Sequence, residues 1–269
     1  MKEKNQQEII AEKYANGELQ VLGRKDTFCF ACVQCGECCR NREDILLNPY
    51  DLFRLCKNKE MNVVEFIKKY CELYPGQSSK LPLVMIKFRP VYEFGTDRVI
   101  GTRCPFLGQK DGLYHCRVHK SKPFVCFSYP LGRVQKQSGI AEYILQDDGT
   151  CLGAEKARKE SIMQVAENWM CGKEKLDLEE RFNHIFSYFL YNHRKWINVD
   201  KLAGSKKALP IYKKWFGMVG ELLYTNYDFT ADDTVFLDQL KANIDAVEEL
   251  SKLVVTELDE FIDLRPKNN

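Results

Sequence analysis

The chain has 269 residues, of which 45% are hydrophobic and 29% are charged. These proportions are close to the averages of globular proteins and exclude a disordered chain or a fibrous repeat. Forty basic and thirty-eight acidic residues give a formal net charge of +2. So small an excess argues against a protein that coats nucleic acid over its whole surface, although a local basic face is compatible with it.

The beginning of the chain and its hydropathy indicate the compartment. The N-terminal segment is basic but lacks the apolar run of a secretory signal. No apolar stretch reaches the ~18–20 residues of a membrane helix, and the longest candidate, residues 81–86, is short and contains Pro82. We therefore expect a cytoplasmic protein that does not bind a membrane.

Short helices and strands are predicted in the N-terminal part of the chain. Asn48-Pro49 is typical of a helix start, because proline fits the first helical turn. By apolar spacing, helices are expected over residues 3–15, 50–58 and 62–74. Strands are expected over residues 83–88, 91–94, 99–100 and 140–145, with a turn at 95–97. The cysteine-rich residues 29–39 leave no room for a regular element.

Helical spacing predominates after residue 154. Helices are predicted over residues 155–171, 176–195, 208–224 and 233–263. Aromatic residues at helical spacing are expected to fill a core there: Trp169, Phe186, Tyr188, Phe189, Trp196, Trp215 and Phe216. The predicted fold is α+β, with a cysteine-rich metal-binding domain over residues 1–153 that contains short strands and helices, followed by an all-helical domain over residues 154–269.

Cysteine is the unusual component of the sequence. Of the twelve cysteines, eleven lie at or before Cys151. In a reducing compartment, dense cysteines indicate metal or redox chemistry, and a disulfide framework is the weaker alternative. Three overlapping C-x2-C steps run from Cys29 to the Cys38-Cys39 pair, with Gly36 suited to a turn of positive φ. Such steps let two thiolates converge on one ion, which predicts a thiophilic metal.

Eight cysteines form the predicted ligand set. They are Cys32, Cys35, Cys38, Cys39, Cys104, Cys116, Cys126 and Cys151. A structural zinc or a [4Fe-4S] cluster takes four thiolates, so eight indicate two sites or one cluster with neighbouring cysteines. Adjacent Cys38 and Cys39 would point apart, which favours two sites. The spacing does not decide between zinc and an iron–sulfur cluster.

Other residues near this set have both a structural and a ligand interpretation. Cys56, Cys71 and Cys171 lie on or beside apolar helix faces and are expected to pack in the core. Cys29 and His119 are candidate ligands, and His119 is equally suited to an exposed basic loop. Basic residues close to the cysteines either offset the negative charge of a metal centre or form a solvated surface: Arg40, Arg42, Arg117, Lys120 and Lys122.

The cysteine motifs carry a resemblance over about residues 28–153. Cys32-x2-Cys35-Gly-x-Cys38-Cys39-Arg40 is followed by Cys104-Pro-Phe-Leu and by Cys116-x9-Cys126, with Tyr129-Pro130 after it. This combination resembles the CxxCxxCC family of zinc- or iron-chelating domains, the YkgJ-type cysteine-cluster proteins, and implies zinc or iron–sulfur binding. Where that family usually has a Tyr-Glu-x-Arg-Pro run, this chain has His-Lys-Ser-Lys-Pro at residues 119–123.

The same pattern is similar to part of flagellin lysine N-methylase. That similarity implies an alternative function, an iron–sulfur-dependent protein-modifying enzyme that uses S-adenosylmethionine. The chain has no common nucleotide-binding glycine motif and no conventional catalytic triad, so no catalytic residue is assigned. A metal-binding protein whose helical half receives a protein partner or a protein substrate is the favoured hypothesis. A nucleic-acid-binding zinc module is the weakest, because the charge is nearly balanced and finger-type spacing is absent.

Overall fold

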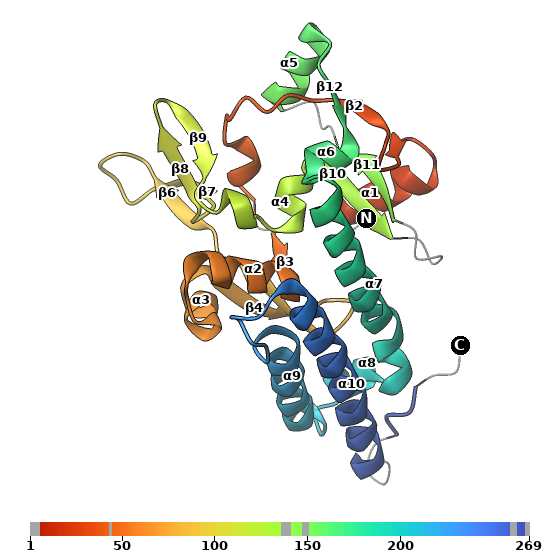
Figure 1. Ribbon diagram of the computed structural model, residues 1–269. Helices are drawn as coiled ribbons and strands as arrows, with labels where there is room; N and C mark the ends of the chain where they lie inside the picture. The colour runs from red at the N-terminus through yellow and green to blue at the C-terminus, as the bar shows by residue number, and fades with distance from the viewer. Residues whose placement is uncertain (1–5, 43–44, 136–140, 147–150, 259–262, 267–269) are drawn as a thin grey trace. The chain divides into compact units, whose positions relative to one another are not determined.

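The computed structural model describes residues 6–42, 45–135, 141–146, 151–258 and 263–266 (Figure 1). The chain forms two compact units. The first unit comprises Met1–Cys38, Gly108–His115 and Phe124–Glu180, and the second comprises Cys39–Leu107, Cys116–Pro123 and Arg181–Asn269. Within the described residues, no helix combines the length and the apolar character needed to cross a membrane.

The first unit is built around small antiparallel sheets. β11 (Ala141–Leu145) lies between β1 (Val21–Leu22) and β10 (Leu131–Gln135), and β12 (Met163–Val165) pairs with β2 (Thr27–Cys29). Its helices are α1 (Gln6–Ala15), α4 (Phe124–Ser128), α5 (Leu152–Glu160) and α6 (Ala166–Met170). Four elements cross the boundary between the units: η1 (Glu37–Cys39), β8 (Leu107–Lys110), β9 (Leu113–Cys116) and α7 (Lys173–Trp196).

The second unit combines two small sheets with most of the helical residues. β5 (Pro82–Ile86) lies between β3 (Leu46–Leu47) and β4 (Cys71–Pro75), and β6 (Arg89–Tyr92) forms a hairpin with β7 (Val99–Arg103). Its helices are α2 (Pro49–Lys59), α3 (Val63–Tyr70), α8 (Val199–Gly204), α9 (Leu209–Tyr224), α10 (Asp233–Leu258) and the short η2 (His119–Ser121).

Aromatic side chains form the core of each unit. In the first unit the ring of Trp169 packs edge-on against that of Phe30 at 5.0 Å, and its indole nitrogen donates to the Tyr129 carbonyl at 2.9 Å. In the second unit the rings of Phe53 and Phe236 lie 4.5 Å apart, and both side chains are fully buried. Burial of such rings contributes a large share of the hydrophobic stabilisation.

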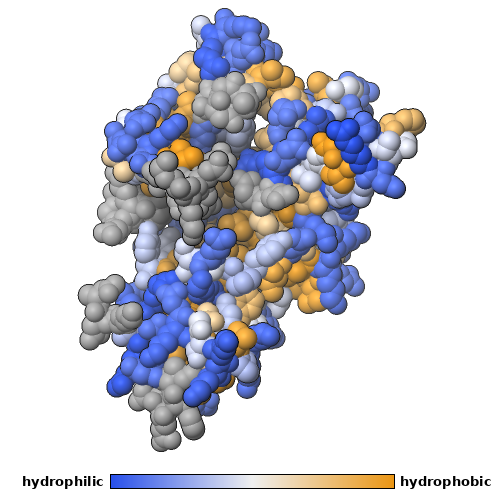
Figure 2. Space-filling model, turned by 180° about the vertical axis from the view of Figure 1, so that it is seen from behind, coloured by the Kyte–Doolittle hydropathy of each residue, from blue (hydrophilic) through white to orange (hydrophobic). Residues whose placement is uncertain are grey.

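The surface keeps some apolar residues exposed. On the face drawn in Figure 2, hydrophilic residues predominate and apolar patches interrupt them.

Of the aromatic residues predicted to fill the core, Phe189, Trp196 and Trp215 are buried. The prediction was wrong for Tyr188, which is 55% exposed on α7.

Several predicted elements are confirmed with shifted ends. The helix expected after Asn48-Pro49 is α2, where Asn48 accepts from the Asp51 amide at 2.7 Å and completes a capping box. The strand expected over residues 140–145 is β11. The α+β class is confirmed as well, with small sheets early and helices predominating late in the chain.

Two predicted helices were wrong in part. The helix expected over residues 62–74 ends at Tyr70, because Cys71–Pro75 pairs with β5 as strand β4. The helix expected over residues 155–171 is interrupted by β12, since Ser161 adopts a left-handed φ of 55° and the next residues pair with β2. The end of the helix predicted over residues 233–263 includes 259–262, which lie outside the described residues. A domain boundary at residue 153 stays a prediction, because compactness does not test independent folding.

Candidate metal centre

The eight predicted ligands divide between the two units. Cys32, Cys35, Cys38, Cys126 and Cys151 belong to the first unit, and Cys39, Cys104 and Cys116 belong to the second. All twelve cysteines are free thiols. Each of the eight is exposed or half-buried. The two sets are called the first and the second cysteine group below.

The first cysteine group is assembled by backbone contacts between distant segments. The Ala31 amide donates to the Gly153 carbonyl at 3.2 Å, which holds the residue before Cys32 against the second residue after Cys151. A Cβ atom on Gly153 would lie 2.5 Å from the Ala31 carbonyl oxygen, so only glycine permits this approach. The Gln164 side chain also donates to the Phe30 carbonyl at 3.1 Å. The cysteine loop is therefore anchored at the start of α5.

The Cys35 thiol interacts electrostatically with Cys38 and Cys151 of the same group. Burial raises the pKa of Cys35, a backbone hydrogen bond from Glu37 lowers it, and the charges of Cys151, Cys38 and Glu37 raise it further. Thiolates that face one another disfavour each other's ionisation. A metal ion at this place would reverse the sign of the interaction.

Gly36 shapes the turn between Cys35 and Cys38. Its φ of 77° lies in the left-handed region, as the sequence predicted. A Cβ atom there would lie 2.9 Å from Cγ of Tyr114, and the Tyr114 amide donates to the Gln34 carbonyl at 3.0 Å. Strand β9 thus packs against this turn and fixes the position of the loop. Cys126 is half-buried on α4, which packs against α6 in the same unit.

The second cysteine group is assembled around the turn that follows β7. The Cys104 amide donates to the Cys39 carbonyl at 2.8 Å, so these two cysteines are neighbours across adjacent segments. The Arg117 amide donates to the Phe106 carbonyl at 2.9 Å, which places Cys116 beside the same turn. The Arg117 guanidinium also donates to the Pro105 carbonyl at 2.7 Å and locks the turn.

Cysteines expected in the core are found there. Cys56 and Cys71 are buried, and burial raises the pKa of both thiols to about 12, which keeps them protonated and unreactive. Cys171 is half-buried and packs against the aromatic core of the first unit. Cys29 is half-buried on β2, and its ligand role stays a prediction. His119 is exposed on η2, in the second unit.

Metal ligation by the eight cysteines stays a prediction as well. Among the described residues, no group of three or more His, Cys, Asp or Glu side chains is arranged to hold a metal ion. The chemistry of the donors nevertheless fits zinc or iron, because accessible thiols from separate segments are the usual ligands of both. Sequence reasoning found the cysteines but missed Gly153 and Tyr114, whose roles depend on contacts between distant segments.

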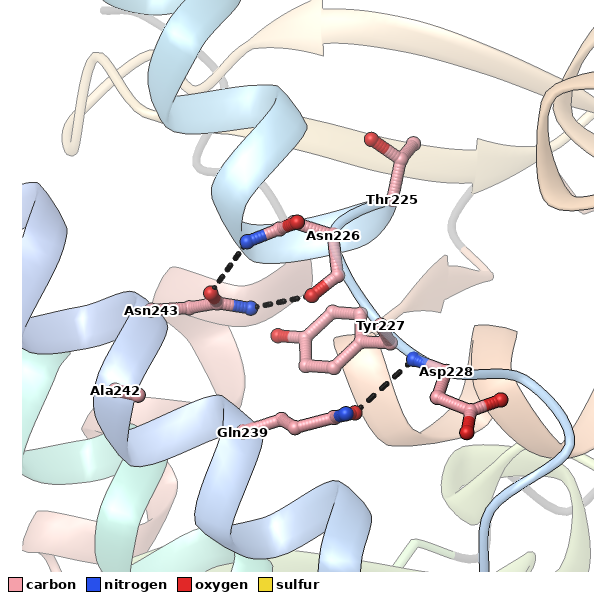
Figure 3. A pocket seen from close by; sticks show the side chains of 7 residues that line it. All are labelled: Thr225, Asn226, Tyr227, Asp228, Gln239, Ala242 and Asn243. Atoms are coloured by element: carbon pink, nitrogen blue, oxygen red, sulfur yellow. Dashed lines mark hydrogen bonds between the residues drawn. The ribbon is translucent and has the colours of Figure 1, made fainter.

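A pocket elsewhere in the second unit has a different chemistry. Figure 3 shows this space of about 280 Å³ between the end of α9 and α10. Asn226 and Asn243 bond to each other across it at 2.8 and 2.9 Å, and the Asp228 amide donates to Gln239 at 3.1 Å. Its lining contains neither cysteine nor histidine, so it contributes no ligand of the predicted kind.

Comparison with known proteins supports a metal-binding segment. Residues 31–152 match the family model CxxCxxCC, described as a "Putative zinc- or iron-chelating domain". The matched segment contains all eight predicted ligands and covers somewhat less than half of the chain. No curated protein and no solved structure matches the chain. These results give no support to a relation with flagellin lysine N-methylase or to a site for S-adenosylmethionine.

Proposed function

We propose that this protein binds zinc or an iron–sulfur cluster through the thiolates of its two cysteine groups. The observation that carries the proposal is the hydrogen bond from the Ala31 amide to the Gly153 carbonyl, which joins the segment that follows Cys151 to the start of the C-x2-C loop. The family match over the same residues supports the same chemistry.

The first cysteine group has enough thiols for a complete site. We assign Cys32, Cys35, Cys38 and Cys151 as the ligands of one tetrahedral zinc or one [4Fe-4S] cluster, with Cys126 as the alternative fourth ligand. Bound zinc would supply a structural cross-link, whereas a cluster would supply electron transfer. The protein itself supplies the Glu37 amide, which donates toward Cys35 and stabilises its thiolate.

The second cysteine group needs a fourth donor. Cys39, Cys104 and Cys116 provide three thiols, and His119 lies in the same unit with an exposed imidazole. A Cys3His set is an established ligand combination for structural zinc. We therefore assign His119 to this second site. Free thiols at this density fit a reducing compartment, so we place the protein in the cytoplasm.

Anaerobic purification followed by metal, sulfide and absorption analysis tests the proposal. About four irons and four sulfides in the first site of each chain, with a broad absorption band near ~400 nm, would identify an iron–sulfur cluster. A colourless protein that contains zinc would identify structural zinc sites. Cys35→Ser is expected to empty the first site only, and Cys104→Ser the second only. Cys171→Ser is the matched control, because this half-buried thiol packs against the core. Absence of both metals from the unsubstituted protein would contradict the proposal.

A further inference from the structure

Three arginines occupy one rung of the small sheet formed by β6 and β7. Arg89 and Arg103 are directly opposite in the antiparallel register, and Arg103 is paired with Arg40 across an isolated bridge. Directly opposed residues project to the same face, with Cβ atoms ~4.5–5.5 Å apart. This set, called the arginine rung, therefore places three guanidinium groups on one face over about two strand spacings, or ~10 Å.

Two arginines of the rung have no carboxylate partner. Arg89 and Arg103 are exposed, and neither forms an ion pair or a side-chain hydrogen bond with any residue of the described ranges. Two neighbouring cations, by contrast, each have a carboxylate partner. The guanidinium group of Arg98, on the same hairpin, lies 3.8 Å from the Glu93 carboxylate. The ammonium group of Lys87 lies 3.5 Å from the Glu72 carboxylate. Arg89 and Arg103 differ in this respect from both of these neighbours.

Opposed arginines lower the stability of the hairpin. Like charges at directly opposed positions destabilise a strand pair. An anion bound between Arg89 and Arg103 would remove that repulsion and satisfy both groups. Guanidinium presents a planar fork of donors that matches a carboxylate in bidentate geometry. The strand register holds the Cβ atoms of Arg89 and Arg103 opposite each other, so both guanidinium groups can reach one anion.

We propose that the arginine rung is a docking site for an acidic segment of a protein partner, whose carboxylates engage Arg89 and Arg103. This role goes beyond metal binding and does not depend on it. The other end of the hairpin supports a protein as the partner. Tyr92, Ile100 and Phe94 are exposed there by 55%, 57% and 102%. Arginine combined with exposed aromatic residues is typical of protein–protein interfaces.

The charges of the hairpin favour a peptide over a nucleic acid. Glu93 and Asp97 lie in the segment between the strands, beside the exposed aromatic residues. A single strand of nucleic acid would stack its bases on those aromatics, which would bring its phosphates close to the two carboxylates. A peptide with a compact acidic cluster needs only the rung itself and can place apolar side chains at the tip.

Fluorescence anisotropy with the full-length protein tests the docking site. The probe is a labelled peptide of eight glutamates, titrated at low ionic strength, where charge pairing is least screened. The double variant Arg89→Gln/Arg103→Gln is expected to bind at least about tenfold more weakly, since two charge-assisted contacts are lost. Arg98→Gln is the matched control, because it removes one paired cation from the same hairpin and leaves the rung intact.

Several outcomes would overturn the inference. The inference is wrong if the unsubstituted protein does not bind the peptide. It is also wrong if Arg98→Gln loses as much peptide affinity as the double variant, because the rung would then act only as general surface charge. Tighter binding of a labelled single-stranded oligonucleotide, lost in the double variant, would replace the peptide with nucleic acid. Metal content measured on the same samples is expected to be unchanged. Its loss in the double variant would assign the arginines to the cysteine centre instead. A protein that holds no metal would leave the peptide titration valid.

Discussion

Gly153 and Ala31 approach each other so closely that the Ala31 amide donates to the Gly153 carbonyl at 3.2 Å, and a Cβ atom on Gly153 would lie 2.5 Å from the Ala31 oxygen. This contact joins the loop before Cys32 to the start of α5 after Cys151. Because the obstructing atom belongs to the backbone, the clash cannot be relieved by a side-chain rotation. The positions of Cys32 and Cys151 therefore depend on the absence of a Cβ atom at residue 153.

Substitution of Gly153 by alanine is expected to weaken the first metal site. The loop must move to accommodate the Cβ atom, at a cost of about 1–3 kcal/mol in the free energy of unfolding. Metal content per chain and the melting temperature measure the effect. Gly204→Ala is the control, since a Cβ atom there meets nothing within 4 Å. Full metal retention in Gly153→Ala would show that the contact does not position the ligands.

Gly36 offers a sharper comparison, because the chain contains a matched glycine. Gly36 and Gly112 have φ values of 77° and 78°, but only the Cβ position of Gly36 is obstructed, by the Tyr114 ring at 2.9 Å. In both alanine variants the left-handed conformation is expected to lower the free energy of unfolding by ~1–2 kcal/mol. Only Gly36→Ala is expected to lower metal retention as well. Equal metal content in the two variants would show that the contact between Gly36 and Tyr114 does not position the metal ligands.

His193 predicts a pH dependence of stability. Its side chain is 3% exposed on α7, and its Nδ1 lies 2.9 Å from the Leu190 carbonyl oxygen. Burial lowers the pKa of His193 in the folded protein, and the nearby Arg194 lowers it further. The unfolded state therefore binds more protons below pH ~6.5, and stability falls as the pH drops through that range, by up to about 1.4 kcal/mol per unit.

Urea unfolding at pH 7.5 and 5.5 measures this contribution. The unsubstituted protein is expected to lose stability between the two values, and His193→Gln is expected to lose less, because glutamine takes up no proton. His184, which is exposed on the same helix, is the control position. If His193→Gln keeps the full pH dependence, other groups cause it.

Local signals in the sequence were sufficient for some elements and for the choice of ligands. Asn48 and Pro49 specify the start of α2 through contacts within one turn, and the cysteine spacing is itself local. The strand at Cys71 and the strand at Met163 were missed, because each forms by pairing with a distant segment, β5 and β2. Apolar spacing alone cannot distinguish such a strand from a continued helix.

The same distinction holds for the site. Gly36 could be predicted as a turn residue from its place in the motif, whereas the need for glycine at position 153 follows only from the approach of Ala31. The arginine rung has no sequence signature either. Arg40, Arg89 and Arg103 are far apart in the chain, and only the strand register places them in one row.

The repulsion in that row leads to a final prediction, that Arg103→Thr stabilises the hairpin. Threonine removes the charge directly opposite Arg89 and favours a strand, so the local stability is expected to rise by ~0.2–1 kcal/mol. Hydrogen exchange of the β7 amides measures this local change. The gain should shrink at high salt, because the exposed charges it relieves are screened.

Arg98→Thr provides the comparison for that measurement. Its ion pair with Glu93 is exposed, and such pairs contribute ~0–1 kcal/mol, so its removal should leave exchange unchanged or slightly faster. If Arg103→Thr also exchanges faster, the aliphatic part of Arg103 stabilises the sheet by more than its charge destabilises it. In that case the rung is not a strained arrangement, and the reason for expecting an anionic partner there is removed.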